Sequence, residues 1–184
     1  MSVAYVPKKI YLTKGVGKHR EKLSSFEMAL RSAGIAQYNL VRVSSIFPPH
    51  CKLISAQEGQ KSLKSGQVLF VVMSENATNE PHRLVAASVG LAIPKDRSQY
   101  GYLAEHHSFG QTDNKAGDYA EDLAATMLAT TLGIEFDAEK AWSEREEAFK
   151  MEKTFLKTRN VVQSAEGHAK GLWSTVVALG VFIF

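Results

Sequence analysis

Two adjacent serines, Ser44 and Ser45, end an apolar stretch and stand directly before the run Ile46-Phe47-Pro48-Pro49. One interpretation is a polar strand end that the two prolines turn. The other is a self-cleavage site, in which the Ser45 hydroxyl attacks the Ser44 carbonyl to give an ester. β-Elimination then releases the upstream chain, and hydrolysis of the dehydroalanine leaves a pyruvoyl group at position 45.

The self-cleavage interpretation has three physical requirements. It needs a serine after the bond, a peptide held out of its relaxed geometry, and a donor for the developing oxyanion. Pro48 restricts Phe47 to extended conformations, and neither proline can donate an amide to a sheet. The prolines therefore supply rigidity just downstream, but the residues alone leave both interpretations open.

Other common catalytic patterns do not occur in the sequence. The six histidines show no HExxH spacing, and the neighbours His106 and His107 would point to opposite faces of a strand, so no metal site is predicted. Gly15-Val16-Gly17 lacks the third glycine and the Lys-Ser/Thr pair of a phosphate-binding loop and is predicted to be a turn. No serine lies in a GxSxG motif, so a hydrolase triad has no anchor.

Length and charge describe an ordinary globular chain. It has 184 residues and a formal net charge of +3, with basic and acidic residues interleaved, which predicts one domain over residues 1–184 and no nucleic-acid partner. The longest apolar run, residues 176–184, is far shorter than the about 20 residues that cross a membrane, and the start of the chain lacks the order of a signal peptide. The single cysteine, Cys51, fits a reducing, cytoplasmic location.

The patterning predicts strands interrupted by helices. A helix is expected over residues 23–34, with Ser24 and Glu27 in capping-box spacing, Phe26, Leu30 and Ala33 inward, and Gly34 at its end. A second helix is expected over residues 116–132, with Tyr119, Leu123, Met127 (or Ala124) and Thr131 on one side, and a shorter one over residues 138–151. Strands are expected over residues 38–43, 67–74, 84–93, 100–109, 154–164 and 173–184. This order predicts an α+β layered sandwich with mostly antiparallel pairing.

Several segments then carry a specific resemblance. The run NLVRVSSIFPP at residues 39–49 is similar to the processing segment of the pyruvoyl-dependent arginine decarboxylases. The resemblance extends to four further segments, FEMALRSAGI at 26–35, GLAIPKD at 90–96, YGYLAEHHSFG at 100–110 and AGDYAEDLAATMLATTLGIEFD at 116–137. It covers nearly all of the chain beyond the first few residues.

The resemblance implies both an architecture and an activity. It implies cleavage into a β chain of residues 1–44 and an α chain of residues 45–184, a four-layer αββα sandwich, and a homotrimer with sites between subunits. It also implies that a covalent pyruvoyl group from Ser45 forms a Schiff base with L-arginine and supports its conversion to agmatine and CO2.

The same resemblance gives roles to three more residues. Glu105 matches the family's catalytic glutamate and is expected to be a proton donor buried against apolar side chains. Asn39 matches a residue thought to support processing and to orient the carbonyl, although six residues, about 20 Å of straight strand, separate it from Ser45. Glu27 stands where family members can carry an aspartate, and its carboxylate is expected to bind the substrate guanidinium.

Two alternatives remain open at this point. A pyruvoyl-dependent decarboxylase of another basic amino acid, such as histidine, would use the same electron sink, because the sink does not depend on the side chain. An unprocessed, non-catalytic sandwich protein would also fit the elements. Substitution of Ser45 by alanine separates the last alternative from the enzymes, because it abolishes cleavage only where cleavage occurs.

Overall fold

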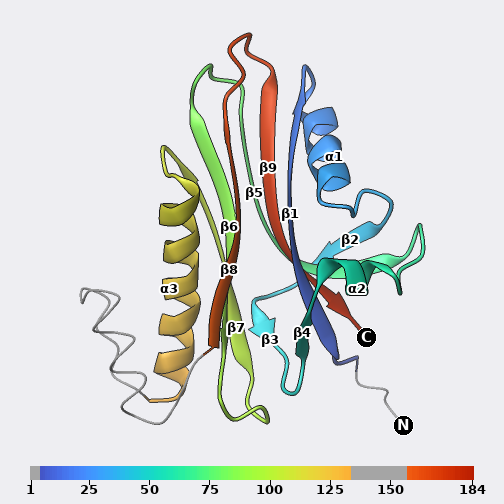
Figure 1. Cartoon of the computed structure of the whole chain (residues 1–184), viewed down its shortest axis with the longest axis vertical. Helices are drawn as coiled ribbons and strands as arrows, with labels where there is room; N and C mark the ends of the chain where they lie inside the picture. Colours follow the sequence, from blue (N-terminus) through green and yellow to red (C-terminus); the bar gives the residue numbers. More distant parts are fainter. Residues whose placement is uncertain (1–4, 134–156) are drawn as a thin grey trace.

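The computed structural model describes residues 5–133 and 157–184, and in these ranges the chain is α+β with mostly antiparallel sheets (Figure 1). One sheet has the strand order β2-β5-β9-β1-β4 and the other has the order β3-β7-β6-β8. The elements are β1 (Lys9–His19), α1 (Lys22–Ser32), β2 (Asn39–Arg42), β3 (Ile46–Phe47), β4 (Lys52–Ile54), α2 (Ala56–Gln60), β5 (Val68–Thr78), β6 (Leu84–Ile93), β7 (Gly101–Phe109), α3 (Asp113–Thr131), β8 (Lys157–Glu166) and β9 (Trp173–Ile183).

The inner faces of the two sheets share one apolar core. Val72 of β5 and Val176 of β9 pack in it with Val89 of β6 and Leu103 of β7, and all four side chains are fully buried. β-Branched and aliphatic side chains at alternate positions suit such half-buried strands, because successive residues point to opposite faces. Only the β1–β4 and β2–β5 pairs are parallel among the described strands.

Helix α1 packs on β1 and β9, and two glycines of β1 allow its close approach. A Cβ atom on Gly15 would lie 2.0 Å from the carbonyl oxygen of Ala29, and one on Gly17 would lie 2.1 Å from that of Ser25. The sequence-based prediction of a turn at residues 15–17 is therefore wrong. These glycines lie inside a long strand, where the missing side chains leave room for the helix backbone.

The start of α1 also differs from the prediction. The helix begins at Lys22 after Glu21, with no side-chain cap, so Ser24 and Glu27 do not form a capping box. Ser25 is buried instead, and its hydroxyl donates to the carbonyl of Lys22. The predicted end is confirmed, since Gly34 follows the helix with a φ of 75°, a conformation that glycine adopts without strain.

Helix α3 packs on β6, β7 and β8, and in Figure 1 it lies on the opposite side of the sheets from α1. Its buried face consists of small residues together with Leu128, whereas Tyr119 and Leu123 are exposed, so the side of the helix that carries these two residues faces away from the sheet. The reason lies in β6, where a Cβ on Gly90 would meet the Ala120 carbonyl oxygen at 2.0 Å. Only a small-residue face fits a helix that lies this close to the sheet.

Most of the predicted strands are confirmed, including the one at residues 84–93. The predicted helix at 138–151 and the first three residues of the predicted strand at 154–164 lie outside the described residues. The prediction missed β1, β3, β4 and α2. In the part of the chain that the structure describes, no helix combines the length and apolar character needed to cross a membrane.

Candidate active site

The Ser44–Ser45 bond lies where the chain passes from one sheet to the other. Upstream, β2 pairs in parallel with β5, and downstream, β3 pairs with β7 of the second sheet. Ser44 is exposed and Ser45 is half-buried in a bend between the two strands. The bond is therefore held from both sides by strand pairing but is itself part of neither ladder.

The backbone forms a tight turn centred on Ser45. The Ile46 amide donates to the Ser44 carbonyl oxygen over 3.0 Å, which is the hydrogen bond of a γ-turn. The Ser45 carbonyl oxygen in turn accepts from the Leu103 amide at 2.8 Å, which fixes the turn to β7. The carbonyl that the proposed attack needs therefore already has an N–H donor at its oxygen.

Glu105 of β7 faces this turn. The Ser45 hydroxyl donates to Glu105 Oε2 over 2.9 Å. Glu105 shares a strand face with Leu103, which lies in the core, but its own side chain is exposed, so the expectation of burial against apolar side chains is wrong within one chain. The structure thus joins the serine and the glutamate that the sequence analysis selected, in a setting open to water.

Two buried serines fix the strand that carries Glu105. The Ser74 hydroxyl of β5 donates to the carbonyl of His106 at 2.7 Å, across the space between the sheets. Ser88 of β6 donates to the same carbonyl at 3.3 Å and to that of Ala116 at 2.7 Å. The backbone next to Glu105 is therefore held by side chains of two neighbouring strands.

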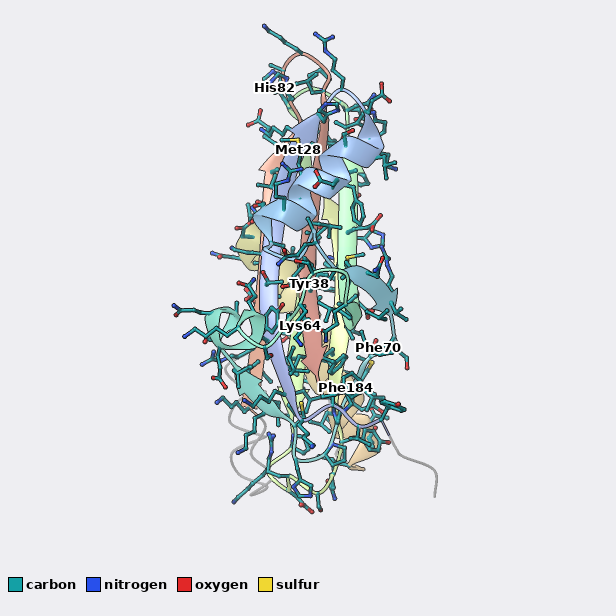
Figure 2. All side chains as sticks on the ribbon, turned by 90° about the vertical axis from the view of Figure 1, so that its right-hand side faces the viewer. Met28, Tyr38, Lys64, Phe70, His82 and Phe184 are labelled. Atoms are coloured by element: carbon teal, nitrogen blue, oxygen red, sulfur yellow. The ribbon has the colours of Figure 1, made fainter. Side chains whose placement is uncertain are left out.

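An apolar pocket of about 310 Å³ lies next to the Ser44–Ser45 bond and is lined by residues from both sides of it. Phe70 and Phe184 form one wall, with ring centroids 5.5 Å apart, and Figure 2 shows their side chains near each other in the lower half of the molecule. The complete lining is Tyr5, Pro7, Val43, Ser44, Ile46, Pro48, Phe70, Phe182 and Phe184. The pocket can accept an aliphatic stem beside the turn.

Asn39 lies at the start of β2, away from the hydroxyl of Ser45. Its side-chain amide donates to the Gly66 carbonyl at 2.9 Å, and its backbone amide donates to the carbonyl of Gln67 at 2.9 Å. These bonds close the connection into β5. Within one chain the structure therefore places the Asn39 side chain in a strand-start contact and not on the Ser45–Glu105 pair.

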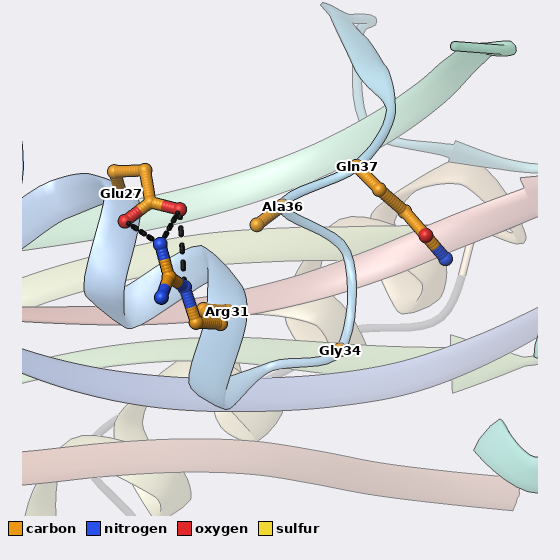
Figure 3. Close-up of a pocket in the computed structure, with 5 residues that line it drawn as sticks. All are labelled: Glu27, Arg31, Gly34, Ala36 and Gln37. Atoms are coloured by element: carbon orange, nitrogen blue, oxygen red, sulfur yellow. Dashed lines mark hydrogen bonds and ion pairs between the residues drawn. The ribbon is translucent and has the colours of Figure 1, made fainter. Parts of the chain in front are cut away.

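Glu27 lies on α1, on the far side of the five-stranded sheet from β7. Its carboxylate accepts from Arg31 Nη2 at 2.9 Å through Oε2 and from Arg31 Nε at 3.2 Å through Oε1, which makes a two-pronged ion pair (Figure 3). Both side chains line a pocket of about 400 Å³ together with Gly34, Ala36 and Gln37. Within one chain Glu27 is thus separated from Ser45, and the guanidinium that it holds is one of its own helix.

The groups that hold the turn are not among the site residues predicted from the sequence. Two of them, the amides of Ile46 and Leu103, are backbone groups whose role depends on geometry and leaves no trace in residue type. A third, Arg97, comes from the loop between β6 and β7 and contacts the segment just after Ser45. Among the described residues no three His, Cys, Asp or Glu side chains gather as metal ligands.

Comparisons with known proteins identify the family to which this chain belongs. Residues 9–184 match the model of the pyruvoyl-dependent arginine decarboxylase family. A probable pyruvoyl-dependent arginine decarboxylase of Chloroherpeton thalassium is 60% identical over 98% of this chain and 100% of its own length. The pyruvoyl-dependent arginine decarboxylase 2 of Methanosarcina acetivorans is 54% identical over 97% of each chain. The chain belongs to the pyruvoyl-dependent arginine decarboxylase family.

The family implies a covalent pyruvoyl group, and the residues at the turn fit it. Such a group arises from a serine whose preceding peptide bond is broken, and Ser45 combines a hydroxyl on a carboxylate with a preceding carbonyl on an N–H donor. The chemistry of this donor set matches what the conversion needs. Glu105 and the backbone of β7 would hold the group in place.

Proposed function

We propose that the chain cleaves itself between Ser44 and Ser45 and then converts L-arginine to agmatine and CO2. The observation that carries the proposal is the arrangement at the turn, where the Ser45 hydroxyl bonds Glu105 and the Ser44 carbonyl accepts from Ile46. The names of the relatives support the substrate.

Cleavage uses only residues of this chain and one water. Glu105 takes the proton of the Ser45 hydroxyl as its oxygen attacks the Ser44 carbonyl carbon, and the Ile46 amide stabilises the charge on the carbonyl oxygen. The peptide C–N bond breaks, the amine takes a proton, and an ester remains. A base then takes the Cα proton of position 45 as the Cβ–O bond of the ester breaks, which gives a Ser44 carboxylate and a dehydroalanine at position 45. Water converts the dehydroalanine into the keto group with release of ammonia.

The cleaved protein stays a single domain over residues 1–184 on this proposal. The small chain, residues 1–44, contributes β1, α1 and β2, and the large chain, residues 45–184, contributes the other elements. β1 pairs along its whole length with β9, and β2 pairs with β5. These partners belong to the large chain, so breaking one peptide bond leaves the sheet pairings intact.

The pyruvoyl group, when formed, supplies a carbonyl that withdraws electrons from the substrate α-carbon as CO2 leaves. Glu105 then acts as the proton donor at that carbon, since its carboxyl group lies within hydrogen-bond reach of position 45. The neighbouring apolar pocket, whose lining includes Pro48 and Phe182, receives the aliphatic part of the substrate.

Binding of the substrate guanidinium depends on the oligomer in this proposal, because Glu27 would come from a neighbouring subunit. Glu105 is exposed in one chain, and the apolar side chains of Tyr5, Ile46 and Phe184, which line the pocket next to Ser44, are also exposed. A homotrimer of four-layer αββα sandwiches would cover this surface and would let Glu27 and Asn39 of a neighbouring subunit complete the site. Arg31 already shows that Glu27 can hold a guanidinium in fork geometry.

The first test is the intact mass of the purified protein under denaturing conditions, with a carbonyl probe on any fragment. We expect chains of about 5 and 15 kDa, in proportion to 44 and 140 of 184 residues, with a keto group on the larger one. Ser45→Ala is the control and should give one chain of 20.3 kDa. An uncleaved, unmodified wild-type chain would overturn the proposal and favour the non-catalytic alternative.

The second test uses Glu105→Gln, which keeps the shape of the side chain but cannot take up or release the proton. We expect slower cleavage and a kcat for arginine lower by about 10²–10⁴-fold in the cleaved fraction. Release of ¹⁴CO2 from labelled arginine and from labelled histidine measures the substrate choice. Equal turnover of the two amino acids would contradict arginine specificity while leaving the pyruvoyl chemistry in place.

A further inference from the structure

Residues 45–51, the hook, form a compact segment that would become the new end of the large chain. The hook contains the bend at Ser45, the strand β3 and a turn closed by the bond from the Cys51 amide to the Pro48 carbonyl at 3.2 Å. Before cleavage it is anchored on two sides, because β2 upstream pairs with β5. After cleavage only the downstream contacts remain, so these contacts alone would place position 45.

Arg97 contributes several of these remaining contacts. Its guanidinium donates to the Cys51 carbonyl and lies over the Phe47 ring, with 5.4 Å between the guanidinium carbon and the ring centroid. Its own carbonyl accepts from the His50 amide at 2.8 Å. One half-buried residue thus binds the hook at its middle and at its end, through both side chain and backbone.

Phe47 connects the Arg97 contact to Ser45, which lies two residues earlier in the hook. Phe47 is 1% exposed and pairs with Gly101 of β7, and its neighbour Ile46 pairs with Tyr102. The strand that receives the hook is the strand that carries Glu105. Arg97 lies in the loop that joins β6 to β7, so it holds the hook from a segment that leads directly into β7.

We infer that Arg97 is a positioning residue that keeps the hook seated on β7 after cleavage, so that position 45 stays opposite Glu105. The inference rests on the proposed cleavage. Arg97 contacts neither Ser45 nor Glu105 in the described hydrogen bonds and acts through Phe47 and Cys51. Its effect is therefore larger on the cleaved enzyme than on the cleavage step, because the uncleaved chain has the second anchor at β2.

The experiment compares Arg97→Met with Arg83→Met. Arg83 is a matched control, since its guanidinium lies over Phe109 at the other end of β7, with 4.9 Å from guanidinium carbon to centroid, remote from the turn. For Arg97→Met we expect cleavage close to wild type, a kcat lower by about 10- to 100-fold and a KM changed by less than about twofold. Arg83→Met should match the wild type in all three.

Hydrogen exchange of the cleaved proteins gives a readout independent of turnover. We expect the peptide that covers the hook to exchange faster in Arg97→Met, with α3 peptides unchanged, and Arg97→Lys to restore part of the protection because it keeps a cation over Phe47. If Arg97→Met does not fold, Arg97→Lys carries the test with the same directions.

The other outcomes would contradict either the role of Arg97 or the proposed function. Wild-type kcat and wild-type exchange of the hook in Arg97→Met would overturn the inference, as would a complete block of cleavage with no defect in the fold. Failure of the wild-type protein to cleave or to release CO2 would instead overturn the proposed function. The two failures are distinguishable, since the wild-type measurement precedes the variants.

Discussion

The chain is held by long strand pairings upstream of the Ser44–Ser45 bond and by the short hook downstream of it. Upstream, β1 lies in the interior of its sheet, between β9 and β4, and is covered by α1. Downstream, the hook has two paired residues of β3, the Ser45–Leu103 bond and the contacts of Arg97. After cleavage the small chain therefore keeps its strand pairings, whereas position 45 is held only by the few contacts of the hook.

The largest expected effect concerns the upstream side. Because β1 is an interior strand, the small chain should remain bound after cleavage and should separate only when the sheet unfolds. Size-exclusion chromatography in native buffer, followed by mass analysis of the peak, measures this. Recovery of a free small chain from cleaved native protein would contradict the picture of an upstream side held by strand pairing.

Gly15→Ala should weaken the same side by about 2–3 kcal/mol in free energy of unfolding. The added Cβ would meet backbone atoms of Ala29 and Ala33, which cannot rotate away. Urea unfolding of the uncleaved Ser45→Ala background isolates this effect from cleavage. Lys14→Ala is the control, since that side chain is exposed on the same strand and should change stability by less than about 0.5 kcal/mol.

Ser74→Ala should weaken the downstream side of the Ser44–Ser45 bond. It removes the bond to the His106 carbonyl next to Glu105, which we expect to lower kcat about 3- to 10-fold and stability by about 1 kcal/mol. Ser174→Ala is the matched control, because Ser174 is equally buried but bonds the Glu166 carbonyl on β8. A similar kcat in both variants would remove Ser74 from the support of Glu105.

Tyr11→Phe should have the smallest effect and bears on the core beneath α2. The Tyr11 hydroxyl is buried with no hydrogen-bond partner among the described residues, so its removal should change stability by less than about 1 kcal/mol at pH 8. Burial raises the pKa of Tyr11 from 10.0 to about 12, so the folded state keeps this proton while the unfolded chain loses it. Stability therefore falls as pH rises from 10 towards 12.

In Tyr11→Phe this alkaline loss should be smaller. Urea unfolding at pH 8 and pH 10.5 measures the slope, and Tyr119→Phe, at an exposed tyrosine of α3, should leave the slope unchanged. An identical slope in the Tyr11 variant and the wild type would mean that other groups govern the alkaline loss.

The strands of this fold were largely predictable, and the helix faces were not. Alternating apolar residues and proline boundaries placed β5, β6, β7 and β9, because these signals are local. The face of α3 and the role of Gly15 depend on how closely a helix approaches a sheet, which is a tertiary property. The sequence pattern emphasises bulky side chains such as Tyr119. The structure instead buries alanines such as Ala120, because a small residue is needed where the helix lies over Gly90.

The candidate site likewise combines features that the sequence can predict with features that depend on tertiary structure. Ser45 and Glu105 were selected through the resemblance, and their hydrogen bond is a finding of the structure. The amides of Ile46 and Leu103 could not be selected, since every residue but proline carries one. The expected burial of Glu105 was inferred from its neighbours on the strand, but β7 leaves the core after Leu103, so strand parity alone could not predict exposure.

The pairing of β1 with β9 also determines when the five-stranded sheet can form during synthesis of the chain. The first described strand of the chain has to wait for the last described strand to leave the ribosome before its sheet can close. The upstream anchor of the Ser44–Ser45 bond depends on that sheet, because β2 joins it through β5 and β9. Maturation is thereby ordered after translation, and a truncated or stalled chain would keep its serine unconverted.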